Sequence, residues 1–218
     1  MEDAEQRLEP HIQDSTWPDW VLPGIAKLGV NGLQIKDHGG PGLTSVESGA
    51  ILYEMAKIDG SIGLLFFIQN FVGIASIDQL GDSAQRDRML PSLINLDKVA
   101  SFALTEPENG SDASNLKTTA RKVDGGFILN GTKRWIGNGT FADYIIVWAR
   151  YESKVQGFVV TKGSKGLRTE KMEGKIAVRV AQNAMIYMND VFVPDDMRLV
   201  KGTDFETSAN SLLRTSRL

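Results

Sequence analysis

The first part of the chain places its apolar residues at a helical period. One amphipathic helix is indicated by apolar residues that recur at about 3.6-residue spacing, namely Val46, Ala50, Ile51, Met55 and Ile58. Thr44 and Glu47 stand before them with the spacing of a capping box, in which a hydroxyl and a carboxylate each bind a backbone N–H. We expect this helix to end at Gly60.

A nearly continuous apolar run follows from Ile62 to Ile77, interrupted only by Gln69 and Asn70. It predicts a buried helix that Gly81 ends. Residues 82–90 predict another helix, with Pro91 directly after it. Residues 1–98 are therefore expected to form a helical bundle.

The period changes near Val99. Short apolar or alternating runs, separated by turn residues every eight to twelve positions, predict the strands of a sandwich or barrel rather than βαβ units. The predicted strands are 99–105, 118–123, 127–129, 133–136, 143–150, 157–161 and 185–193. Asn130 and Gly131 separate two of these runs and predict a hairpin, because both residues tolerate positive φ.

The last residues predict one more helix. Thr203 and Glu206 repeat the capping-box spacing, and an apolar face follows, made of Phe205, Ala209, Leu212 and Leu213. Since no later segment is available to cover that face, we expect residues 201–218 to open a third, truncated unit. The fold class expected for the whole chain is α+β.

Composition narrows the possible functions. The 218 residues carry 24 basic and 27 acidic side chains, a formal charge of −3, which gives no support to a nucleic-acid surface. The chain has no cysteine and two histidines, so neither a thiolate nucleophile nor a multi-histidine metal site is expected. The run from Ile62 to Ile77 is shorter than the roughly 20 residues of a membrane span, and no span is expected.

Two loops carry candidate chemistry. The segment from Thr105 to Asp112 follows an apolar strand, and the backbone N–H groups of such a turn can hold an anion, with Ser111 as a further donor. Trp135 ends a later strand, where its indole can either stack on a flat ring or pack in the core. Gly137 to Ala142 matches G-x-G-x-x-A, but a strand rather than a helix follows, which argues against a dinucleotide fold.

Together these segments resemble the acyl-CoA dehydrogenase family. Residues 102–112 (FALTEPENGSD) resemble the family signature, in which an aromatic strand leads into T-E-P-x-x-G-S-D. Residues 129–138 (LNGTKRWIGN) resemble its second flavin segment, N-G-x-K-x-W-I-x-N, and Val191 to Pro194 resemble its V-x-V-P element. The similarity runs from about residue 20 to the end.

The resemblance implies three domains: an amino-terminal helical domain (1–98), a β-barrel-like flavin-binding middle domain (99–200) and a carboxy-terminal four-helix domain, of which 201–218 are only the start. It also implies FAD between the last two domains. The residues expected at the cofactor are Phe102, Leu104, Thr105, Gly110, Ser111, Trp135, Ile136 and Gly137.

The resemblance further implies that the complete protein is a homo-oligomer that oxidises an acyl-CoA to the trans-2-enoyl-CoA, with Ser111 also touching that substrate. The family's catalytic base is a glutamate of the carboxy-terminal domain, so no catalytic residue is assigned here, and neither Glu106 nor Glu108 is given that role. An alternative is a non-catalytic remnant that binds flavin weakly or only contacts other subunits.

Two departures refine the resemblance. Gly137 stands where the family usually has Ser or Thr, whose hydroxyl binds flavin N5, and the space so opened would admit oxygen. This form is similar to that of plant short-chain acyl-CoA oxidases, which are peroxisomal, so the electron acceptor is expected to be O₂ or an electron-transfer flavoprotein. Glutaryl-CoA dehydrogenases are also similar but carry an Arg where Gly63 aligns, which favours a neutral acyl chain here.

The expected location is an organelle matrix, with the peroxisome favoured over the mitochondrion. Ser216-Arg217-Leu218 resembles a peroxisomal address. Because the chain is expected to be truncated inside a helix, we interpret this tripeptide itself as an accident of the truncation rather than as a true address.

Overall fold

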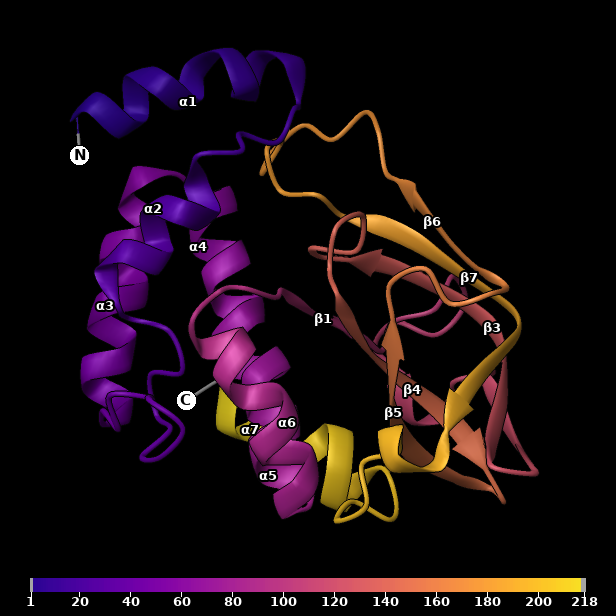
Figure 1. Ribbon diagram of the computed structural model, residues 1–218. Coiled ribbons are helices and arrows are strands. Elements are labelled where there is room, and N and C mark those ends of the chain that lie inside the picture. Colours follow the sequence, from indigo (N-terminus) through magenta and orange to yellow (C-terminus); the bar gives the residue numbers. More distant parts are fainter. Residues whose placement is uncertain (1, 217–218) are drawn as a thin grey trace.

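Helices gather on one side of the molecule and strands on the other (Figure 1). The computed structural model describes residues 2–216. The helices of the first part are α1 (Glu2–Asp14), α2 (Val21–Leu28), α3 (Ser45–Ile58), α4 (Gly60–Phe67), α5 (Ala75–Leu80) and α6 (Ser83–Ile94). The capping box of α3 is confirmed: Thr44 Oγ1 accepts from the Glu47 N–H, and the Thr44 N–H donates to Glu47 Oε2 at 2.8 Å.

The predicted buried helix is longer than expected. Helix α4, a π-helical segment (Ile68–Ile74) and α5 form one helix from Gly60 to Leu80. Gly60 therefore begins a helix rather than merely ending α3, and Asp59 caps it by accepting from the Ser61 N–H at 2.7 Å. At 21 residues, this helix is the one described segment long and apolar enough to cross a membrane, but 67% of its apolar window is buried inside the protein. It is built as a core helix.

The polar residues that interrupt this helix join the two parts of the molecule. Gln69 is fully buried in the π segment, where its side chain donates to the Leu93 and Lys98 carbonyls and accepts from the Ala100 N–H at 2.8 Å. It thus binds the end of α6, the connecting segment and the first strand. An amide side chain in an apolar run is here a satisfied structural link.

The strands form one curled, mixed sheet. They are β1 (Ala100–Ala103), β2 (Thr119–Val123), β3 (Gly126–Ile136), β4 (Tyr144–Tyr151), β5 (Lys154–Thr161), β6 (Leu167–Lys171) and β7 (Ala184–Pro194). Their order is β1-β4-β2-β3-β7-β6, with β5 paired to β4. Pairs β1–β4 and β2–β4 are parallel and the others antiparallel. The α+β class is confirmed, and strand β6, which the sequence did not indicate, is added at the edge.

The hairpin predicted at Asn130 and Gly131 is wrong. Both residues lie inside the single strand β3, which pairs with β7 on either side of them with a register shift between Leu129 and Gly131. The φ of Gly131 is +151°, and a Cβ there would overlap the Thr118 side chain and lie 2.8 Å from its Cα. The Asn-Gly pair therefore makes a β-bulge, a second use of the same conformational freedom.

Helix α6 continues past its proline. Pro91, expected to stop the helix at Leu90, lies inside it, and the last turn extends to Ile94. Leu93 is fully buried and Ile94 nearly so, and burying such side chains contributes about 1.5–3 kcal/mol each. That burial offsets the one backbone hydrogen bond that proline cannot donate.

The last helical segment packs into the core. Its apolar face was expected to be uncovered, and this expectation is wrong for the residues described below. It comprises a π-helical turn (Glu206–Asn210) and α7 (Ser211–Ser216). Ala209 and Leu212 are fully buried in the cluster that holds Ile77 of α5 and Trp148 of β4. The cap is also displaced by one residue from Thr203, because Asp204 Oδ1 accepts from the Thr207 N–H at 2.8 Å. In the ending Ser216-Arg217-Leu218, the last two residues lie outside those the structure describes.

Candidate functional site

A cavity of about 470 Å³ lies between the end of β1, the end of β3 and the last helical segment. It is lined by seven of the residues that the sequence assigned to the cofactor: Phe102, Leu104, Thr105, Gly110, Ser111, Trp135 and Ile136. The eighth, Gly137, is not in the lining. Two segments about 25 residues apart in sequence thus line the same cavity.

A buried ion pair joins the two segments. Lys133 Nζ lies 2.9 Å from Glu106 Oε1 and also donates to the Leu104 carbonyl at 3.1 Å. The remaining capacity of the Glu106 carboxylate is filled by the Lys117 and Thr118 N–H groups and by the Thr118 hydroxyl. Both oxygens of the Glu106 carboxylate are therefore engaged in holding the loop.

Charge pairing decides the ionisation of these two groups. Burial alone would raise the pKa of Glu106, but the Lys133 charge and the hydrogen bonds from Thr118 and Lys117 lower it below 4.5. Burial lowers the pKa of Lys133 to about 8, against the opposing effect of Glu106. At neutral pH both are charged, and the pair fixes Leu104 and Thr105 relative to β3.

The loop donors at the cavity are free. Among the described residues, neither Gly110 nor Ser111 takes part in an intramolecular hydrogen bond, and space is open around the Gly110 Cα. Their backbone N–H groups and the Ser111 hydroxyl are thus available to a ligand. An anionic group such as a phosphate is what such donors hold best.

Trp135 is turned outward by an irregularity in β3. Its φ is +62°, and the pairing of β3 with β7 shifts register between Lys133 and Ile136. The indole is 51% exposed, so the alternative of a core tryptophan is not realised. Bulges of this kind re-aim side chains beside functional sites, and here the bulge presents a flat aromatic surface at the cavity.

Gly137 does not open the space that the sequence indicated. A Cβ on Gly137 would overlap Cδ1 of Ile68, from the π-helical segment. The volume of a side chain at this position is thus already occupied by Ile68, which is nearly buried. The premise of an oxygen-admitting gap is corrected by this contact.

Several lining residues were missed from the sequence. They are Ala113, Ser114, Phe205, Asn210 and Leu213. Phe205 and Leu213 belong to the apolar face already visible in the sequence, but nothing in that pattern indicated which part of the molecule it would meet. Among the described residues, none that lines the cavity has an ionisable side chain. Nowhere in residues 2–216 do three or more His, Cys, Asp or Glu side chains gather as a possible metal site.

The substrate argument built on Gly63 also changes. A Cβ at Gly63 would lie 2.7 Å from the Cβ of Ala56 in α3, so this position faces the neighbouring helix and not the cavity.

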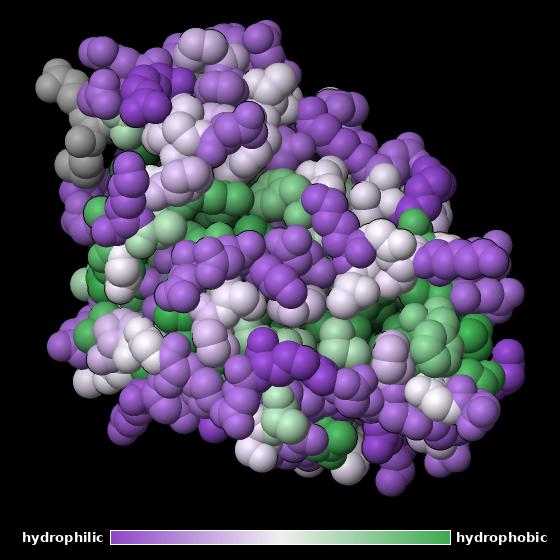
Figure 2. Space-filling view, viewed as in Figure 1, coloured by the Kyte–Doolittle hydropathy of each residue, from purple (hydrophilic) through white to green (hydrophobic). Residues whose placement is uncertain are grey.

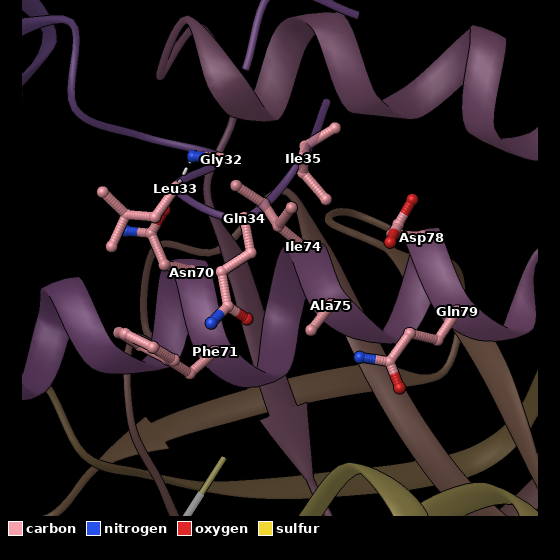
Figure 3. A pocket seen from close by; sticks show the side chains of 10 residues that line it. All are labelled: Gly32, Leu33, Gln34, Ile35, Asn70, Phe71, Ile74, Ala75, Asp78 and Gln79. Atoms are coloured by element: carbon pink, nitrogen blue, oxygen red, sulfur yellow. Dashed lines mark hydrogen bonds between the residues drawn. The ribbon is translucent and has the colours of Figure 1, made fainter. Parts of the chain in front are cut away.

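A second cavity, of about 210 Å³, lies between residues 32–35 and the helix from Asn70 to Gln79 (Figure 3). There, Asn70 Oδ1 accepts from the Gly32 N–H at 2.7 Å. This cavity contains none of the predicted site residues.

Apolar side chains are also exposed over α2 to α4 (Figure 2). Leu28, Val46 and Tyr53 are each more than half exposed there, and Leu28, Ile51, Met55 and Ile58 line a shallow apolar groove. This surface contains none of the residues predicted for the cofactor.

Comparison with known proteins agrees with the motifs. Residues 2–97 match the model of the acyl-CoA dehydrogenase N-terminal domain, and residues 101–191 match that of the middle domain. The chain is 29% identical over 212 residues to a mitochondrial isovaleryl-CoA dehydrogenase of Arabidopsis thaliana, covering 91% of this chain and 51% of that protein. It thus spans about half of that relative's length.

Solved structures give the same result. A glutaryl-CoA dehydrogenase from Mycobacterium smegmatis in complex with FADH2 superimposes with a TM-score of 0.92 at 28% identity, over 99% of this chain and 57% of that one. A butyryl-CoA dehydrogenase from Megasphaera elsdenii gives 0.89 at 28% identity, over 98% and 60%. The chain belongs to the acyl-CoA dehydrogenase family, of which it contains the N-terminal and middle domains.

Proposed function

We propose that this chain is the FAD-binding part of an acyl-CoA oxidoreductase that forms trans-2-enoyl-CoA. The observation that carries the proposal is that one cavity is lined both by Trp135 and Ile136 and by residues of the preceding loop, namely Leu104, Thr105, Gly110 and Ser111. Its composition fits a flavin: an exposed indole and apolar walls suit the ring, and free N–H and hydroxyl donors suit the phosphates. The FADH2 complex of the M. smegmatis relative supports the same cofactor.

In this proposal the chain's own residues bind and orient. Trp135 and Ile136 flank the ring, Phe102, Leu104 and Thr105 form the wall beside it, and Gly110 and Ser111 receive the phosphates, with Ser111 also touching the acyl-CoA. Bound FAD would accept the hydride from the substrate Cβ while a base removes the α-proton. The Glu106–Lys133 pair keeps both segments in place, because neither loop can shift without exposing a buried charge.

The base is proposed to lie outside these residues. The described residues that line the cavity include no carboxylate or imidazole, and general base catalysis needs such a group within about 3 Å of the proton it removes. This supports a contribution from a further helical domain of a longer polypeptide. It equally supports the second candidate, a non-catalytic flavin-binding or subunit-contact module, if this chain acts alone.

The test is spectroscopic. The purified full-length protein should show flavin absorbance, and that absorbance should bleach when an acyl-CoA is added without an acceptor. The 218-residue chain serves as the comparison, because it should retain flavin weakly and show no bleaching. A full-length protein that is free of flavin and cannot be reconstituted with FAD would refute the proposal, whereas turnover by the 218-residue chain alone would refute the external base.

Substrate class and location belong to the same proposal. A neutral acyl chain is supported by the lack of cationic side chains among the described cavity residues, and comparing the turnover of butyryl-CoA with that of glutaryl-CoA tests it.

For location, an organelle matrix is proposed. The curated A. thaliana relative is named as mitochondrial, while the peroxisomal alternative depends on the terminal tripeptide, and imaging of the tagged protein with and without it separates the two.

A further inference from the structure

Arg150 is a cation whose side-chain hydrogen bonds end on backbone carbonyls. It lies near the end of β4, where its own N–H donates to the Thr118 carbonyl at 2.8 Å. One guanidinium nitrogen donates to the Ser153 carbonyl at 3.0 Å, and another donates to the carbonyls of Ser114 and Leu116 at 2.9 and 3.4 Å. Because these carbonyl acceptors are neutral, the hydrogen bonds leave the positive charge of Arg150 in place.

The segment that Arg150 binds forms part of the cavity described above. Ser114 lines this cavity, three residues after Ser111, which also lines it. At the end of the same segment, the N–H groups of residues 117 and 118 donate to the Glu106 carboxylate. A carboxylate therefore holds N–H groups of this segment, and the Arg150 guanidinium holds its carbonyls. Residues 111–118 are thus anchored to the ion-paired loop and to β4 together.

The chemistry of this contact suits arginine. A guanidinium carries five donors in a rigid planar fork and stays charged at any pH at which a protein is folded. It can therefore bind several carbonyls in different directions at once, which the single ammonium of a lysine does less well. Arg150 does not itself line the cavity. Its charge is held behind the backbone of Ser114, next to the cavity but without occupying it.

We propose that Arg150 is a positioning residue for the phosphate end of the cofactor. It holds residues 111–118 so that the free donors of Gly110 and Ser111 stay at the cavity, and its charge favours an anion beside them. This inference rests on the proposed function, which assigns the phosphates to Gly110 and Ser111. In that assignment the flavin ring lies against Trp135 of β3, so loss of Arg150 weakens binding through the phosphates and leaves ring binding as it is.

Substitution of Arg150→Met tests the role, with the Kd for FAD measured by fluorescence titration of the flavin-free full-length protein. We expect the Kd to rise roughly tenfold. Arg150→Lys keeps the charge but not the fork and should raise it about threefold. The matched control is Arg168→Met, which removes an exposed arginine of β6 that pairs with Glu170, and it should leave the Kd unchanged. An unchanged Kd for Arg150→Met, or an equal increase for Arg168→Met, would overturn the proposal.

Double variants separate this positioning role from a general loosening of the fold. Ser111→Ala should raise the Kd for FAD less in Arg150→Met protein than in wild type, because the hydroxyl donor is already displaced there. Trp135→Ala should raise the Kd by the same factor in both backgrounds, since it acts on the ring. Independent effects of Arg150 and Ser111, or equal coupling of Arg150 to Trp135, would contradict the role. Failure of the proposed function is a separate result, because wild-type protein would then not bind FAD.

Discussion

Lys133 and Glu106 form an ion pair at 2.9 Å in which both side chains are shielded from solvent almost completely. The pair connects the two segments that line the cavity. Its burial gives the pair a structural role, since each charge is stabilised by the other, by nearby backbone groups and, for Glu106, by the Thr118 hydroxyl.

Removing one member of this pair should be costly. Glu106→Gln leaves the Lys133 ammonium buried without a counter-charge, and we expect a loss of about 3–5 kcal/mol of unfolding free energy, measured by urea denaturation. The matched control is Glu170→Gln, which breaks the exposed Arg168–Glu170 pair and should cost about 0–1 kcal/mol. Equal costs for the two variants would contradict the structural role of the pair.

Substitution of glycine by alanine should change the unfolding free energy in opposite directions at two positions, Gly131 and Gly49. Gly131→Ala places a Cβ against Thr118 at a φ of +151°, and such overpacking should cost about 1–3 kcal/mol. Gly49→Ala, inside α3 with open space around it, should stabilise by about 0.5–1 kcal/mol. Thermal melts of both variants test the two predictions. An unchanged Tm for Gly131→Ala would argue against the β-bulge.

Trp135 should matter to the cofactor and not to the fold. Because its indole is half exposed, Trp135→Ala should change the unfolding free energy by less than about 0.5 kcal/mol. Loss of ring stacking should raise the Kd for FAD roughly two- to tenfold, as measured by fluorescence titration. Tyr53→Ala, at another exposed aromatic outside the cavity lining, should leave both quantities unchanged, and an equal effect of the two variants would count against the stacking role.

A histidine cluster gives the chain a pH-dependent stability. His38 lies 2.7 Å from Asp87 and 2.6 Å from Asp37, and these hydrogen bonds raise the pKa of His38 above 6.5. Arg86, on α6, also binds Asp37 and Asp78. Since the folded-state pKa is the raised one, the contribution of His38 is complete below pH 6.5 and is lost as the pH rises through that raised value.

The wild-type unfolding free energy should therefore fall above pH 6.5 more than that of His38→Asn. Asparagine cannot titrate in this range and tolerates the positive φ of 53° at this position. Urea denaturation at several pH values measures the difference. Parallel pH profiles for the two proteins would show that the cluster does not titrate as described.

The sequence was informative wherever one local signal had one structural solution. Apolar periodicity located α3 and the Gly60–Leu80 helix, and Thr44 with Glu47 located a cap. Asn130 and Gly131 were misread because positive φ serves a hairpin and a bulge equally well, and only the pairing with β7 along the whole of β3 decides between them. Pro91 was misread because tertiary burial outweighed a local preference.

The candidate site, too, could be predicted from the sequence only where its signals are local. Its loop residues were found because their motifs are local, whereas Phe205, Asn210 and Leu213 reach the cavity only through the return of the last helical segment. The closure at Gly137 was invisible because it depends on Ile68, 69 positions earlier in the chain and brought there by a π-turn with no signature in the apolar period.

The packing of residues 209–212 also constrains how the chain is made. Ala209 and Leu212 complete a core that also contains residues of α5, α6 and β4, so the amino-terminal helices emerge from the ribosome long before the surface that covers them. Until then, α5 and α6 expose apolar area of the kind that chaperones bind. Synthesis of this polypeptide thus passes through a period of vulnerability that ends only when the strands and the final turns have followed.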